Sequence, residues 1–221
     1  MNMRTLRLKV LSKLIEIKLN FQIKRNSEEK NIFSMKNFNI SLIGDSAVGK
    51  TTIANILCNN SEFNEEYIPT VGASMLKVPY QDGENLIWFY IWDTAGMEAY
   101  RSLAPVYYRN SSAALIVYDI SKRETFNNIE DWYNLYSNTV GPDLPVIFIG
   151  NKIDLEEERS VSYDEAERRS KEMNGLFLET SAKTKKNIYK ILEILAEVLK
   201  NYESHQNSSA QLVTEKTTEC C

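Results

Sequence analysis

Phe38-Asn-Ile-Ser-Leu-Ile-Gly44-Asp-Ser-Ala-Val-Gly-Lys50-Thr51 is the stretch of sequence that decides the fold. Its first half is an apolar run that predicts a strand ending in a glycine-rich turn. Its second half, from Gly44 to Thr51, matches G-x-x-x-x-G-K-[ST] without a misfit, and a helix is predicted from Lys50 to about Leu57. Strand, turn and helix in this order are the context that the motif requires. The stretch therefore predicts a phosphate-binding loop in an α/β protein.

The residue types in this loop suit an anionic ligand. The glycines let the backbone curl so that successive N–H groups face phosphates, and the helix N-terminus favours the same negative charge. Lys50 supplies a positive charge for the β- and γ-phosphates, and the Thr51 hydroxyl suits Mg²⁺. The other nucleotide-binding candidates in the loop are Asp45, Ser46, Ala47, Val48, Gly49 and Thr52. The alternative, a chance glycine turn, does not account for the flanking strand and helix, but the motif alone does not indicate which base is bound.

Beyond the loop, strand-like runs alternate with amphipathic stretches, which predicts a mostly parallel six-stranded sheet flanked by about five helices. The further strands are expected at Ala73–Tyr80, Leu86–Trp92, Ala113–Tyr118, Pro145–Gly150 and Leu176–Glu179. Asp82-Gly83 separates the first two of these strands and predicts a hairpin, so one strand is expected to be antiparallel. Apolar residues at helical spacing predict helices over 126–136 and 188–199. Ser162 and Glu165 predict a capping box that opens a helix to about Met173.

The strand and helix patterns lie between residues 35 and 200, a length that fits one domain with a buried core. Residues 201–221 are mostly small and polar, which predicts a flexible tail.

Residues 1–34 form a basic N-terminal extension. We expect it to be poorly ordered, or to precede a translation start at Met35. The alternative is a basic amphipathic helix that contacts anionic lipid. Its apolar face would consist of Leu11, Leu14, Ile15 and Leu19.

The composition argues against several classes of function. A formal net charge of −4 argues against general nucleic-acid binding. The three cysteines, Cys58, Cys220 and Cys221, cannot make a disulfide framework and indicate a reducing setting. The one histidine, His205, lies in the polar tail, so a histidine base or metal ligand is not expected.

Two short motifs follow predicted strands and are suited to reading a base. Asn151-Lys-Ile-Asp154 follows the fifth strand, and Ser181-Ala-Lys183 follows the sixth. Both lie at the carboxyl ends of strands, where open α/β sheets bind ligands. The Asp154 carboxylate can accept the N1–H and the exocyclic amine of guanine, a donor pattern that adenine lacks. Lys152 and Lys183 have apolar stems that can flank a flat base, and Asn151, Ser181 and Ala182 complete the candidate set.

Taken together, these motifs resemble those of the Ras-type small GTPases over roughly residues 36–200. The motifs in order are Gly44–Thr51, Thr70, Asp93-Thr-Ala-Gly96, Asn151–Asp154 and Ser181–Lys183. Within that group the chain is similar to the Rab family through Trp92-Asp-Thr-Ala-Gly96, Tyr100-Arg-Ser-Leu103 and Tyr107-Tyr-Arg109. The stretch Ser102–Arg109 favours the endosomal Rabs.

The resemblance implies a GTP/GDP switch with Mg²⁺ as cofactor. Thr70 would give Mg²⁺ a second hydroxyl, Asp93 would hold it through water, and the Gly96 N–H would bind the γ-phosphate. These contacts disappear on hydrolysis, so two loops would order with GTP and loosen with GDP. Trp92 and Tyr107 would then be presented differently to partners, although both can equally be packing residues.

One position departs from the family. Met97 follows Asp-Thr-Ala-Gly where the family usually has glutamine, which orients the attacking water. A thioether has no N–H to donate and is a weak acceptor, so no assured catalytic residue remains, and intrinsic hydrolysis is expected to be slow. The alternative function is a catalytically silent GTP-binding interaction module.

The chain ends in Cys220-Cys221, which resembles the Rab double-prenylation signal, and two lipid chains give stable membrane anchoring. The resemblance implies a monomer that regulates vesicle traffic and protein transport on the cytoplasmic face of endomembranes, of the endosomal type, while cycling through the cytosol. Its implied partners are an exchange factor, an activating protein, a GDP-dissociation inhibitor, a Rab escort protein and effectors.

Overall fold

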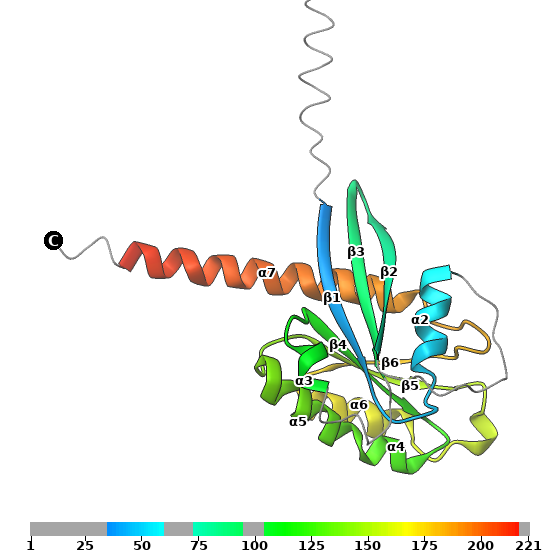
Figure 1. Ribbon diagram of the computed structural model, residues 1–221. Helices are drawn as coiled ribbons and strands as arrows, with labels where there is room; N and C mark the ends of the chain where they lie inside the picture. The colour runs from blue at the N-terminus through cyan, green and yellow to red at the C-terminus, as the bar shows by residue number, and fades with distance from the viewer. Residues whose placement is uncertain (1–34, 60–72, 95–103, 217–221) are drawn as a thin grey trace, which may run out of the picture. The chain divides into compact units, whose positions relative to one another are not determined.

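In the computed structural model, residues 35–59, 73–94 and 104–216 are described, with side-chain surroundings given up to Ser204 (Figure 1). The chain divides into two units, 1–34 and 35–221, and all of the described residues belong to the second. The amphipathic helix considered for the N-terminal extension therefore lies outside the described residues.

A six-stranded sheet forms the centre of this unit. The strands are β1 (Met35–Ile43), β2 (Ala73–Asp82), β3 (Asn85–Thr94), β4 (Ala113–Asp119), β5 (Val146–Asn151) and β6 (Leu176–Glu179). Their spatial order is β2-β3-β1-β4-β5-β6, and every neighbouring pair is parallel except β2 and β3. The predicted mostly parallel sheet with one antiparallel pair is confirmed. The hairpin turns at Gly83, whose φ of 59° is a conformation that glycine adopts without steric cost.

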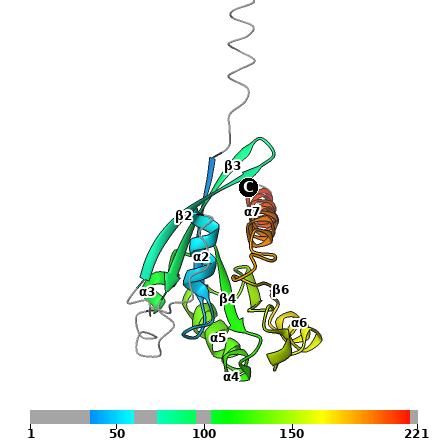
Figure 2. The same cartoon turned by 90° about the vertical axis from the view of Figure 1, so that its right-hand side faces the viewer.

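Helices cover both faces of the sheet (Figure 2). Their bounds are α2 (Lys50–Asn59), α3 (Ala104–Tyr108), α4 (Arg123–Asn127), α5 (Ile129–Val140), α6 (Tyr163–Glu172) and α7 (Lys190–Lys216), with a short 3₁₀ helix at Glu156–Glu158. On one face, α2 and α7 share an apolar core with the sheet, and on the other face α3, α4, α5 and α6 do so.

Strand β4 shows how one sheet serves two cores, because it is buried at every position. Leu115 and Val117 belong to the core under α2 and α7, whereas Ile116 and Tyr118 belong to the opposite core. Alternate side chains of a strand point to opposite faces, so a central strand covered on both sides is apolar throughout.

The helix expected over 126–136 is two helices, α4 and α5, which meet at Asn128. Helical spacing predicts apolar faces but not a break of one residue. The cap predicted for α6 is present, because the Ser162 hydroxyl accepts the Glu165 N–H at 3.3 Å. The Glu165 carboxylate, however, binds Arg123 instead of returning to the cap, so half of the capping box forms.

Helix α7 continues to Lys216, although the composition predicted a flexible tail from Asn201 (Figure 1). Residues 201–216 contain no glycine or proline, and extending an existing helix costs little compared with starting one. Glu203 also forms an ion pair with Lys36 of β1. No helix among the described residues is both long and apolar enough to cross a bilayer.

Candidate functional site

The phosphate loop lies between the end of β1 and the start of α2, as the sequence predicted. Gly44 has φ of +140°, and a Cβ there would lie 2.2 Å from the Val117 carbonyl oxygen of β4. Gly49 has φ of +103°, and a Cβ there would lie 2.3 Å from Nδ2 of Asn151. Both glycines of the motif are therefore needed for space as well as for backbone conformation.

Lys50 is directed back along the loop and is only 6% exposed. Its Nζ donates to the carbonyl oxygens of Gly44 at 2.9 Å and of Asp45 at 2.6 Å. Burial lowers the pKa of Lys50 to about 8, although the nearby carboxylates of Asp93 and Asp45 act in the opposite direction. A buried ammonium group is stabilised by further negative charge close to it, so this position suits an anionic ligand.

The predicted Mg²⁺ ligands Thr51 and Asp93 come together at the end of β3. Thr51 Oγ1 donates to Asp93 Oδ2 at 2.6 Å, and Asp93 Oδ1 is buried with no hydrogen-bond partner among the described residues. Burial raises the pKa of Asp93, against the opposing effects of Thr51 and Lys50. A cation would favour the charged carboxylate, and hydroxyl and carboxylate oxygens are ligands that Mg²⁺ accepts, so these residues fit the metal. Bound there, Mg²⁺ would neutralise phosphate charge.

Asn151, at the end of β5, joins three segments of the site. Its Nδ2 donates to the Val48 carbonyl at 2.9 Å, and its Oδ1 accepts from Thr180 Oγ1 and the Ala182 N–H, both at 3.1 Å. Lys152 makes a second link, because its Nζ donates to the Ala47 carbonyl at 2.7 Å and forms an ion pair with Asp119 at 2.7 Å. The phosphate loop and the two candidate base-reading motifs are thus tied together.

Asp154 and Ser181 also meet, although they come from different motifs. Ser181 Oγ donates to Asp154 Oδ1 at 2.5 Å and accepts the Thr184 N–H at 3.0 Å. Asp154 remains exposed. A carboxylate in a fixed direction and open to solvent is suited to accepting two donors from the edge of a base.

The remaining candidates divide into two groups. Ser46 and Lys183 are exposed on the same loops, and Thr52 is half-buried in α2. The other predicted residues lie outside the described residues: Thr70, Gly96, Met97, Cys220 and Cys221. Their predicted roles remain predictions.

Two supporting residues were missed by the sequence reasoning. Asp119, at the end of β4, pairs with Lys152 and accepts from the Ser121 N–H at 3.0 Å. Thr180 is fully buried beside Asn151. Asp119 is the last residue of β4, and Thr180 comes directly after β6. Their positions at the carboxyl ends of strands could have marked them as site residues in the sequence.

A phosphate loop after a parallel strand, with polar segments gathered at the carboxyl ends of β3, β5 and β6, defines a P-loop nucleotide-binding protein of the α/β class. The sequence model of the Ras family matches residues 39–201, and the chain belongs to the Ras family. Members of this family are small GTPases, so GTP binding and GTP hydrolysis are the general activity.

Proposed function

We propose that this chain is a Rab-like GTP/GDP switch that regulates vesicle-mediated membrane traffic and protein transport. The observation that carries the proposal is the set of bonds from Asn151 and Lys152 to the phosphate loop, because it ties base recognition to phosphate binding. Asp154 would select guanine, and Lys50 and Thr51 would hold the phosphates and Mg²⁺. Thr70 and Gly96 would close over the γ-phosphate and release after hydrolysis.

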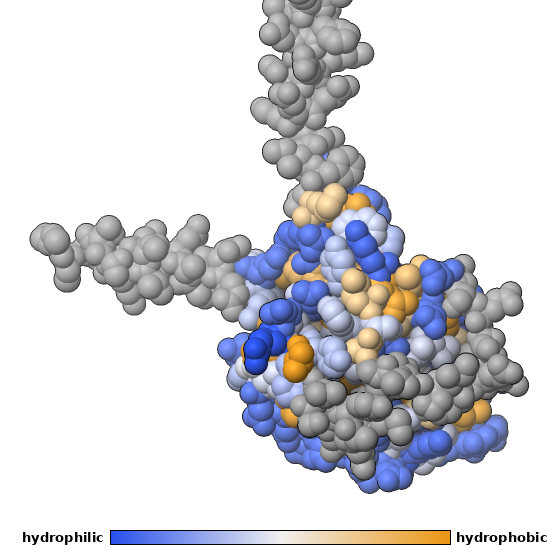
Figure 3. All heavy atoms as spheres, in the orientation of Figure 1, coloured by the Kyte–Doolittle hydropathy of each residue, from blue (hydrophilic) through white to orange (hydrophobic). Residues whose placement is uncertain are grey.

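A surface for partners is supported by three side chains with large apolar parts, which come from β2, β3 and α3. Met75 pairs with Trp92 across β2 and β3, and the Trp92 ring lies 6.3 Å from that of Tyr107. Met75 is 48% exposed, and Trp92 and Tyr107 are half-buried. In Figure 3, apolar residues reach the surface among hydrophilic ones on the face in view. In the sequence, Met75 closely follows residues 60–72, and Trp92 and Tyr107 lie on either side of residues 95–103, where the switch loops are expected.

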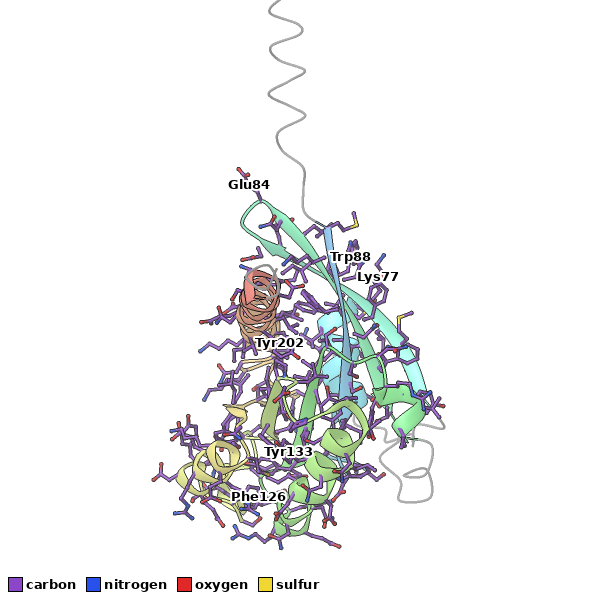
Figure 4. The ribbon with its side chains drawn as sticks, turned by 90° about the vertical axis from the view of Figure 1, so that its left-hand side faces the viewer. Lys77, Glu84, Trp88, Phe126, Tyr133 and Tyr202 are labelled. Atoms are coloured by element: carbon purple, nitrogen blue, oxygen red, sulfur yellow. The ribbon has the colours of Figure 1, made fainter. Side chains whose placement is uncertain are left out.

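The same outer side of the hairpin carries a second cluster. Lys77 Nζ lies 3.9 Å from the centre of the Trp88 ring, and the two side chains are adjacent in Figure 4. A cation over an indole face is favourable by about 0.5–1 kcal/mol at an exposed site. The hairpin therefore offers a partner apolar and positively charged groups side by side.

Met97 makes hydrolysis the step that depends on a partner. Since methionine cannot orient water, intrinsic hydrolysis is proposed to be slower than the roughly 10⁻⁴ s⁻¹ typical of such proteins. Rab-type activating proteins supply both an arginine and a glutamine, so assisted hydrolysis is expected to persist. The second candidate, a catalytically silent GTP-binding module, is favoured by the same residue.

A single-turnover assay separates the two functions. The chain is loaded with GTP, and released phosphate is followed alone and with a Rab-type activating protein. If the chain is a switch, the intrinsic hydrolysis rate of the wild type is slow and rises when the activating protein is added. The intrinsic rate of Met97→Gln is then expected to be faster than that of the wild type. GTP that persists in both conditions identifies the silent module, and an equal intrinsic rate in Met97→Gln contradicts the role assigned to Met97.

Membrane anchoring is proposed to come from two prenyl groups on Cys220 and Cys221. Since one lipid chain gives only marginal binding, loss of both cysteines is expected to move the tagged protein from membranes to cytosol. Microscopy of the double Cys→Ser variant tests the anchor. The same images of the wild-type protein test the proposed endosomal location. Unchanged localisation would contradict the anchor.

A further inference from the structure

The second residue of the phosphate loop, Asp45, has a side chain with its own partners outside the loop. Its Oδ1 accepts from the indole Nε1 of Trp132 at 2.7 Å, and its Oδ2 accepts from Nδ2 of Asn128 at 2.8 Å. Trp132 lies in α5 and is 3% exposed, and Asn128 directly precedes that helix. Both oxygens of the carboxylate are therefore directed at α5.

Asn128 lies at the junction of α4 and α5, and its backbone is helical there, with φ of −82° and ψ of −7°. It holds the N-cap position of α5, where asparagine is a preferred residue because its side chain accepts an N–H of the first turn. Its side chain makes no such cap bond, and its Nδ2 donates to Asp45. The side chain of Asn128 therefore binds the phosphate loop and does not cap α5.

The main chain of Asp45 faces the other way. Its carbonyl oxygen accepts from Lys50 Nζ at 2.6 Å, so the residue that positions the lysine is itself fixed from α5. A free carboxylate in this loop would repel a phosphate ligand, since like charges within a few ångströms oppose one another strongly in a partly buried site. Two N–H donors hold that charge on the α5 side.

We propose that Asp45 is a positioning residue of the nucleotide site. Asn128 and Trp132 hold its carboxylate on α5, and this contact fixes the phosphate loop and keeps the negative charge away from the phosphates. The inference rests on the proposed GTP binding. It assigns to Asn128 and Trp132 a role in retaining nucleotide, although neither belongs to a nucleotide-binding motif.

The test is a cycle of variants of the full-length chain, read out as the release rate of a fluorescent GDP analogue in Mg²⁺. Asn128→Ala with Trp132→Phe removes both donors and is expected to speed release about tenfold, since two hydrogen bonds to a charged group are lost. In an Asp45→Ala background the same two changes are expected to alter the release rate less than about twofold, because the carboxylate that the two donors hold is already absent. Asn127→Ala, a change at an exposed neighbouring asparagine, is the matched control.

Equal acceleration in both backgrounds would mean that Asn128 and Trp132 act only by packing α5, which overturns the inference. A wild-type chain that binds no GDP would overturn the proposed function, and this inference with it. Asn128→Ala alone gives the same comparison, with a smaller expected effect, if Trp132→Phe does not fold. As a readout independent of nucleotide, the indole N–H resonance of Trp132, assigned with Trp132→Phe, is expected to move upfield in Asp45→Ala; an unmoved resonance contradicts the contact.

Discussion

Individual residues of the phosphate loop are fixed by neighbours that approach from other strands. Gly44 combines a positive φ with a carbonyl oxygen of β4 at 2.2 Å from the position of a Cβ. Gly83, in the hairpin turn, also has a positive φ, but a Cβ there would meet nothing within 4 Å. A substitution at Gly83 therefore tests backbone strain alone, whereas a substitution at Gly44 tests backbone strain together with a steric clash.

Gly44→Ala is expected to lower the free energy of unfolding by about 3 kcal/mol or more, because backbone atoms must move apart. Gly83→Ala is expected to cost only about 1–2 kcal/mol, the strain of a left-handed conformation. Urea unfolding of both variants measures the difference. Similar losses at the two positions would contradict the close approach of Gly44 to β4.

Motifs with a fixed chemical role were predictable at this scale. Lys50, Thr51 and Asp93 come together as expected because the loop motif and the strand ends specify their places. The contacts of Asp45 with Trp132 were not predictable, because they join residues 87 positions apart with no shared pattern. Such contacts depend on how the helices pack.

Among the helices and strands, α6 is linked to the start of α4 by an ion pair on the surface. Arg123 donates to both oxygens of Glu165, and this contact lowers the pKa of Glu165. A carboxyl group whose pKa is lowered on folding stabilises the folded protein at any pH above its unfolded-state pKa, which is near 4.5. This stabilisation is lost as the pH falls through the lower, folded-state pKa.

Glu165→Gln is therefore expected to be less stable than the wild type at pH 7, by a modest amount because the pair is exposed. The difference is expected to shrink as the pH is lowered below about 4.5, where the wild type also loses the charge. Urea unfolding at several pH values measures it. A difference that stays constant down to pH 3 would show that the charge of Glu165 is not responsible.

The strands were predicted more closely than the helices. Period-two patterns and the turn at Gly83 located β2, β3 and β6 within a few residues. The break between α4 and α5 and the length of α7 were missed, because helical periodicity records which face is buried and does not specify where a helix ends. Polar composition alone does not end a helix that tertiary packing has already started.

At the scale of the whole molecule, buried apolar side chains hold α7 against the sheet, and its partly exposed side chains form ion pairs with β1 and β2. Leu195 is fully buried in the core that α7 shares with α2, whereas Lys200 pairs with Asp82 of the hairpin and is 44% exposed. Buried apolar contact dominates helix docking, and exposed ion pairs contribute little.

Leu195→Ala is therefore expected to lower the free energy of unfolding by about 2–5 kcal/mol, and Lys200→Ala by less than about 1 kcal/mol. Chemical unfolding of the two variants in the same buffer compares them. A larger loss from Lys200→Ala than from Leu195→Ala would mean that the ion pair, and not the core, positions this helix.

The central claim is that the chain selects a guanine nucleotide through Asp154, Ser181 and the asparagine that joins them to the phosphate loop. The most direct test is competition of GDP and ADP for the Mg²⁺-loaded full-length chain. GDP is expected to bind at least about 10³-fold more tightly than ADP, because a site built to pair with donor groups rejects a base that lacks them. Asp154→Ala is expected to narrow that ratio mainly by weakening GDP, whereas equal binding of GDP and ADP by the wild type would contradict the claim.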